Sequence, residues 1–343
     1  MWSETITNAK PVGKAFFPLD EQLGLPRSGF SPAFAKQMVW LSGLLPFEQS
    51  IEVMARIGQR FVSQSTTWRM VKHYGEQLQA VVEHQRGQVS VERVQLPDAR
   101  HDHKQRKGVS MDGGMVNIRG EGWREMKVGT VFDVELRLER NPQTHELDKI
   151  AHGVNVHYTA VLGTKADFTP ALWALAVEHD LPTAHKRSVV ADGALWIWDV
   201  AEDVCPDAQQ VVDWYHATEH LYKAALALYP NESDLPKRNR WFKTYKHHLY
   251  MGHVETIISV LHKRHLPHLA TYFQRHKRRM QYLEFREEGL PIGSGTVESG
   301  VKQYKQRLCG TGMRWHLDNA KRMIILRSAI LGHDFDELWA KVA

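Results

Sequence analysis

Cysteine is scarce in this chain of 343 residues, which contains only Cys205 and Cys309. Two cysteines cannot build a disulfide framework or a cysteine-based zinc finger, so we interpret both as inert thiols in a reducing cytosol. No apolar run reaches the roughly 18 residues that a membrane-spanning helix needs, and the first residues lack the apolar core of a signal peptide. The sequence therefore predicts a cytoplasmic protein of two or three domains that makes no membrane contact.

Positive charge is unevenly distributed along the chain. The formal net charge is only +5, but basic residues gather in four clusters at 101–107, 236–248, 262–268 and 275–280. Solvated helix faces would explain any one cluster. Four clusters, two of them with interleaved aromatic residues, favour a surface that follows a polyanion such as nucleic acid.

The N-terminal part combines an irregular arm with helices. Residues 1–30 carry prolines and glycines without a sustained period, whereas the helical pattern over 31–85 begins at a serine followed by a proline. Within 47–80, two helices separated by Gly58 predict a helix-turn-helix, with Arg69 and Lys72 as DNA contacts on the second helix. An ordinary helical hairpin is the alternative. The polar residues 86–107 then indicate a linker.

From residue 108 the pattern changes to that of an α/β domain. Strands are predicted at 109–119, 125–138, 155–163, 187–198 and 208–214, with a helix at 168–181 before the fourth strand. Three strands, a helix and a fourth strand is the order of a ribonuclease H-like core, whose first part we place at 108–221. Residues 222–290 exceed a simple connection and are predicted to form an all-helical insertion. Residues 291–343 then supply the final helices of the core.

Three acidic residues have the pattern of a metal-dependent catalytic triad. Asp112 and Asp192 each follow an apolar run and precede a glycine, which predicts a carboxylate at the end of a buried strand. Glu298 lies on a predicted helix after a Gly-Ser-Gly turn. Carboxylate oxygens are preferred ligands of hard cations, so we predict that this triad holds two Mg²⁺ ions, which Mn²⁺ can replace. For each aspartate alone, capping of a turn is the alternative role.

Basic residues follow Glu298 along the chain. Lys302 and Lys305 share its helical face, Arg307 extends the polar surface, and Arg314 lies in a glycine-containing loop. We interpret these four side chains as contacts to DNA phosphates. Helix salt bridges and simple solvation are the alternative roles.

Asp213 and His216 admit three interpretations. They form either a plain buried hydrogen-bonded pair or, as we prefer, a pair that supports the acidic site. The third interpretation is a zinc metalloprotease, because His216, Glu219 and His220 have the H-x-x-E-H order and Glu298 could be the remaining ligand. That interpretation leaves both Asp-Gly pairs and the helix-turn-helix unexplained.

Three tryptophans lie near the acidic positions. Trp196 and Trp198 alternate on what is predicted to be the fourth strand, and Trp214 follows Asp213. Alternating tryptophans more often fill the surface of a sheet than stack on bases, so we predict that all three pack in the core or in the wall of the site.

Several motifs occur in an order that resembles a known family. They are FPLDEQLGL at 17–25, GWREMKVGTVF at 122–132, ADGALWIW at 191–198, DWYHATEHL at 213–221, GSGTVESG at 293–300 and CGTGMRW at 309–315. Together they span nearly the whole chain. The chain resembles DDE transposases of bacterial insertion sequences, of the ISKra type within the Mutator-like group.

This resemblance implies an activity and specific residue roles. It implies that Asp112, Asp192 and Glu298 take the positions of the catalytic triad, and that the segment from Asp213 to His216 matches a signature of the group. The expected activity is metal-dependent cleavage at the terminal inverted repeats of an element and strand transfer into target DNA, by a homodimer or higher oligomer in the bacterial cytoplasm. Relatives often carry a cysteine-bearing segment before FPLDEQLGL, and this chain has none. A nuclease of the same fold and a domesticated DNA-binding protein are alternatives.

Overall fold

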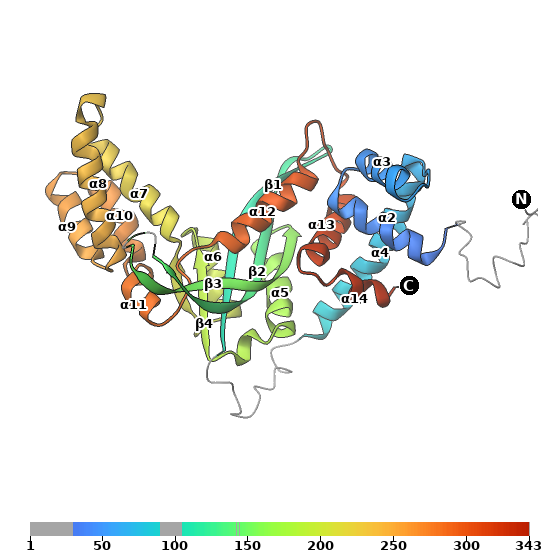
Figure 1. Cartoon of the computed structure of the whole chain (residues 1–343), viewed down its shortest axis with the longest axis horizontal. Coiled ribbons are helices and arrows are strands. Elements are labelled where there is room, and N and C mark those ends of the chain that lie inside the picture. The colour runs from blue at the N-terminus through green and yellow to red at the C-terminus, as the bar shows by residue number, and fades with distance from the viewer. Residues whose placement is uncertain (1–29, 90–104, 142, 144, 343) are drawn as a thin grey trace, which may run out of the picture.

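The computed structural model describes residues 30–89, 105–141, 143 and 145–342. These residues form a mixed α/β fold with one five-stranded sheet and helices on both sides of it (Figure 1). The strands are β1 Arg106–Ile118, β2 Gly122–Arg140, β3 Leu147–Leu162, β4 Lys186–Ala191 and β5 Gln209–Val212. Their spatial order is β3-β2-β1-β4-β5. The predicted arm at 1–29 and most of the predicted linker lie outside the described residues.

The sheet changes direction at β1. β1 pairs antiparallel with β2, and β2 pairs antiparallel with β3, whereas β1 to β4 and β4 to β5 are parallel. Ser110 of β1 is aligned with Val190 of β4 in the parallel pair. Asp112 and Asp192 each lie two residues beyond this aligned pair, at the same end of it. Two residues is also the period with which side chains alternate between the faces of a sheet. The register therefore brings two distant aspartates together.

Three of the strand predictions need correction. The strand predicted at 155–163 is the second half of β3, which begins at Leu147. Asp112 lies inside β1 rather than at its end, because β1 continues to Ile118 along β2 after its pairing with β4 has stopped. The predicted strand 187–198 ends at Ala191, and its tryptophans belong to helix α6 Leu195–Val204. Gly193 turns the chain there with a φ of +104°, and the Ala194 amide donates to Asp192. A short apolar run does not by itself distinguish strand from helix.

The three tryptophans pack in the apolar core, as expected. Trp198 and Trp214 are buried, and Trp196 packs against the same apolar cluster between the sheet, α6 and α5 Lys165–Glu178. Helix α5 begins with a reciprocal capping box between Thr164 and Asp167, which satisfies two of the free amides at its start.

The segment 222–290 contains helices and no strand. Helix α7 Trp214–Leu228 starts directly after β5, and α8 Leu235–Tyr250, α9 Val254–Lys263, α10 Pro267–His276 and α11 Tyr282–Glu287 follow it. Figure 1 shows α7 to α10 projecting together beyond one end of the sheet. The chain then returns to the sheet with α12 Gly295–Leu308, α13 Leu317–Leu331 and α14 Phe335–Ala340.

The N-terminal helices pack against the C-terminal ones. Helices α2 Pro32–Leu44, α3 Phe47–Ile57 and α4 Gln64–Gln88 share an apolar cluster with α12, α13 and α14 (Figure 1). Ser31 caps α2, as the sequence predicted, and Ser63 caps α4. A Cβ atom on Gly43 would lie 2.3 Å from Ile330, so glycine is what permits α2 to approach α13 this closely.

Candidate active site

The three predicted catalytic acids interact electrostatically. Burial raises the pKa of Asp112, and the negative charges of Asp192 and Glu298 raise it further, against the opposing hydrogen bond from the Gly113 amide at 2.6 Å and the charge of Lys305. Asp112 comes from β1, Asp192 follows β4, and Glu298 comes from the first turn of α12. Three elements thus contribute carboxylates whose charges act on Asp112. These three acids are not among the described sets of side chains whose ligand atoms all lie within 4.8 Å of one another.

Helix α12 carries Glu298 to the sheet by packing across β1. A Cβ atom on Gly114 would lie 3.4 Å from Lys305 and 3.5 Å from Val301, so a glycine in β1 leaves room for the helix. At the start of the same helix, the hydroxyls of Thr296 and Thr130 of β2 are 3.5 Å apart. Figure 1 shows α12 lying over β1 and β2.

Asp213 is the most highly connected carboxylate of the site. Its side chain is fully buried and accepts from the His216 amide at 2.9 Å and from the Ser294 amide at 2.6 Å. The hydroxyl of Ser294 bridges to Asp213 at 3.0 Å and to Glu298 at 2.9 Å. Burial raises the pKa of Asp213, but hydrogen bonds from His216 and Ser294 outweigh it and hold this pKa below its usual range. Asp213 therefore ties the start of α7 to the start of α12.

His216 lies among these carboxylates. Its Nδ1 is 3.1 Å from Asp213, and this hydrogen bond raises the pKa of His216 to about 9, with further contributions from the charges of Asp192 and Glu298. Ligand atoms of Asp213, His216 and Glu298 all lie within 4.8 Å of one another. Glu298 is thus grouped more tightly with the Asp213–His216 pair than the sequence indicated. Ser294, which sequence reasoning missed, makes the connection, and the Gly-Ser-Gly turn was the only indication of it.

The Asp213–His216 pair predicts a pH dependence of stability. The folded pKa of about 9 is above the ordinary value of about 6.5, so the ion pair stabilises the fold fully below pH 6.5 and is lost as the pH rises through about 9. The imidazole is partly exposed and screened by water, so we expect a contribution of about 1 kcal/mol. Denaturant unfolding of wild type and His216→Gln between pH 6 and 10 would measure it, and equal stability losses in both proteins would contradict it.

Most of the predicted DNA contacts lie on the surface. Lys302, Lys305, Arg314, Arg69 and Lys72 are exposed, and Lys72 also stacks over Trp68 at 5.6 Å. Arg314 lines a depression of about 750 Å³ together with Arg119, Asn117 and three glycines, which was not expected from the sequence. The backbone pairing of Arg119 and Asn117 with Trp315 brings the two arginine-bearing segments together. In the sequence, the only indication that Arg119 belongs to this depression was its position at a strand end, directly before a glycine.

Arg307 corrects the prediction of a surface contact. It is 2% exposed, and its Nε donates to the carbonyl of Ser42 at 2.7 Å in the last turn of α2. Its guanidinium also lies 5.3 Å from the ring of Phe47 and 5.1 Å from that of Trp315, and burial, followed by the charge of Arg327, lowers its pKa to about 10. Arg307 thus satisfies a helix-end carbonyl, which only the docking of α2 could reveal.

Arg307→Ala is expected to destabilise the protein by roughly 3 kcal/mol, because it leaves a cavity and a buried carbonyl without its partner. Gln306→Ala, at the exposed neighbouring position of α12, should change stability by no more than about 0.5 kcal/mol. Urea unfolding followed by circular dichroism compares the two variants. A surface role for Arg307 would make their midpoints equal.

His220 does not join a ligand group with His216. Its ring stacks on Tyr272 with 3.6 Å between centroids, and burial lowers its pKa. Within the described part of the chain, the sets of three metal-ligating side chains are Asp213, His216 and Glu298, and His157, His179 and Asp334. The arrangement that the metalloprotease interpretation requires is therefore not the one that forms.

A cavity of about 540 Å³ adjoins the acidic site. Trp214, Tyr215 and Gly293 are among its lining residues, and a Cβ atom on Gly293 would lie 3.9 Å from Asp213.

Within the described part of the chain, every helix is too short or too polar to span a membrane. Comparison with protein-family models and with curated proteins finds no match.

Proposed function

We propose that this protein is a DDE-type transposase with a ribonuclease H-like core. The observation that carries the proposal is the register of β1 and β4, in which Asp112 and Asp192 each lie two residues beyond the aligned pair Ser110–Val190. The charges of Asp192 and of Glu298 on α12 both act on Asp112. The strand order β3-β2-β1-β4-β5, antiparallel on one side of β1 and parallel on the other, supports the same core.

The donor set fits Mg²⁺. Asp112, Asp192 and Glu298 offer only carboxylate oxygens. Burial is the main cause of the raised pKa of Asp112, and the charges of Asp192 and Glu298, which a cation would neutralise, add to it. These three residues would hold two ions, which supply Lewis-acid activation and charge stabilisation in phosphoryl transfer. Mn²⁺, with similar ligand preferences, is expected to substitute.

The other residues of the site position the acids and the substrate. Asp213 and Ser294 hold the start of α12 so that Glu298 faces the sheet, and protonated His216 balances part of the local negative charge. Lys302 and Lys305 are exposed on the same helix and would contact phosphates of the bound strand.

The test is DNA cleavage in the presence of Mg²⁺. A supercoiled plasmid that carries the gene with its flanking DNA is incubated with purified protein, and 3′ ends are mapped. Cleavage at two fixed boundaries, followed by joining to a second plasmid, is the expected result. Cleavage without fixed boundaries would assign a nuclease of the same fold, and zinc-dependent peptide hydrolysis would assign the protease. Binding without any cleavage would indicate a domesticated DNA-binding protein.

We expect the active species to be a homodimer or higher oligomer on DNA, in the bacterial cytoplasm.

The helices α3 and α4 are proposed to bind the element ends. The double variant Arg69→Ala with Lys72→Ala should weaken binding and make the slope of log affinity against log salt shallower by about 1.8, since each phosphate contact contributes about 0.9. Lys165→Ala with Lys186→Ala removes equal charge from ion-paired lysines elsewhere and is the control. Fluorescence anisotropy at several salt concentrations measures both. If the slope is unchanged in the Arg69→Ala, Lys72→Ala variant, α3 and α4 do not bind DNA and only pack against the rest of the fold.

A further inference from the structure

A second group of ligand-type side chains lies away from the proposed active site. His157 comes from β3, His179 caps the end of α5, and Asp334 lies in the connection between α13 and α14. Their ligand atoms all lie within 4.8 Å of one another. None of the three belongs to the motifs from which the transposase proposal was built.

The spacing within this group suits coordination better than hydrogen bonding. Nδ1 of His157 is 3.3 Å from one oxygen of Asp334 and 3.4 Å from the other, whereas hydrogen bonds of this type centre near about 2.9 Å. Two ligands that each lie about 2.1 Å from a tetrahedral ion are roughly 3.4 Å apart. The observed separation is that of two ligands on one ion.

His179 belongs to this group and has a buried ring nitrogen. Its Nε2 is inaccessible to solvent and has no hydrogen-bond partner among the described residues. The rings of His157 and His179 stack with 3.5 Å between centroids. Stacked rings direct their in-plane lone pairs side by side, so binding of one ion by both requires one ring to turn about its broad terminal torsion.

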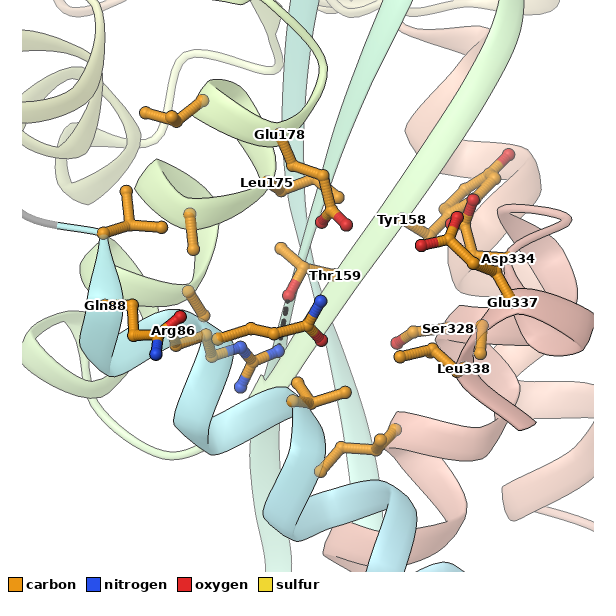
Figure 2. A pocket seen from close by; sticks show the side chains of 18 of the residues that line it. Arg86, Gln88, Tyr158, Thr159, Leu175, Glu178, Ser328, Asp334, Glu337 and Leu338 are labelled. Carbon is orange, nitrogen blue, oxygen red and sulfur yellow. Dashed lines mark hydrogen bonds between the residues drawn. The ribbon is translucent and has the colours of Figure 1, made fainter. Parts of the chain in front are cut away.

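The surroundings favour a cation. Figure 2 shows the carboxyl groups of Glu178, Asp334 and Glu337 around one cavity, whose volume is about 280 Å³. Burial raises the pKa of Glu178, and the charges of Asp334 and Glu337 raise it further. A second cavity of about 240 Å³ is lined by His157 and His179, so an ion has access. Lys107 also lines it, but its ammonium group is paired with Asp133.

We propose that His157, His179 and Asp334 bind one divalent transition-metal ion of the zinc class. Two imidazoles and one carboxylate suit Zn²⁺ and leave a fourth position for water or for Glu178. Because the ligands come from β3, α5 and the α13–α14 connection, the ion fastens the C-terminal helices to the sheet. It has a structural role, separate from Mg²⁺ at the acidic site.

The experiment is titration of chelator-treated protein with Zn²⁺ by calorimetry, with thermal unfolding in parallel. Wild type should bind one equivalent, and its Tm should rise by several degrees because the ion binds only the folded state. His179→Gln and Asp334→Asn should weaken binding by roughly tenfold or more and remove the Tm shift. His268→Gln, an exposed histidine of α10, is the matched control and should behave like wild type.

A further variant separates this site from the group around Asp213. His216→Gln should retain zinc binding if the proposed ligands are correct. Loss of zinc in His216→Gln, or unchanged binding in both His179→Gln and Asp334→Asn, would overturn the proposal. Anomalous scattering at the zinc edge from crystals of wild-type protein decides the matter if the variants fail to fold, because the peak must lie between His157, His179 and Asp334.

Discussion

Asp112→Asn, Asp192→Asn and Glu298→Gln are each expected to lower DNA cleavage by about 1,000-fold or more, which corresponds to roughly 4 kcal/mol of transition-state stabilisation. Each change keeps the side-chain shape but removes a negative charge and an anionic oxygen ligand from the proposed triad. Plasmid cleavage with Mg²⁺ measures the loss, and DNA binding should remain near wild type because none of the three supplies positive charge.

The matched control for this series is Asp199→Asn on α6. Asp199 also carries a carboxylate close in sequence to Asp192, but it is exposed and pairs with Lys165 at 3.1 Å. The Asp199→Asn variant should cleave DNA at the wild-type rate. Near-normal cleavage by any one of the three acid variants would remove that residue from the triad. If only Glu298→Gln stayed active, the grouping of Glu298 with Asp213 and His216 would be purely structural.

Asp213→Ala is expected to be the most destabilising substitution near the site, at about 3–5 kcal/mol. The change removes the acceptor of four hydrogen bonds, leaves the Ser294 amide buried without its partner and leaves the His216 charge uncompensated. Since Ser294 also holds Glu298, cleavage should fall in parallel with stability. Chemical unfolding and the plasmid assay measure the two effects separately.

Ser294→Ala is the graded comparison for Asp213→Ala. It removes only the bridging hydroxyl and keeps the amide hydrogen bond to Asp213, so it should cost about 1 kcal/mol. Cleavage should decrease even where the protein is fully folded, because Glu298 loses its contact at 2.9 Å. If Asp213→Ala proved no less stable than Ser294→Ala, the proposed connection between α7 and α12 would be wrong.

The sequence allowed the strands around the acids to be predicted because they show strong local patterns. The runs before Asp112 and Asp192 are mostly apolar and contain valine, which favours strands, and the glycines after them are characteristic of turns or close packing. The same reasoning failed at 195–198, where an apolar run with tryptophans forms α6. Burial on several sides removes the alternation that separates strand from helix, so the pattern alone could not decide.

Surface exposure of the basic residues was predictable only in part. Lys302 and Lys305 are exposed, as helical spacing from Glu298 indicated, but Arg307 on the same helix is buried against α2. Arg307 and its hydrogen-bond partner Ser42 are separated by 265 positions along the chain, and no local sequence period predicts such a contact. The zinc-class ligand group is a similar case, since His157, His179 and Asp334 have no spacing that resembles a metal motif.

By itself, the sequence determined the local features of this protein: strands, helix starts, the all-helical character of 222–290, and the chemical identity of the acids. These depend on neighbours within a few residues, through caps, side-chain period and backbone preference. The tertiary structure alone decided that Asp112 and Asp192 share one end of a parallel pair, that Ser294 joins Asp213 to Glu298, and that Arg307 is buried. Those outcomes depend on register and helix docking, where the free energy comes from burying surface between segments far apart in the chain.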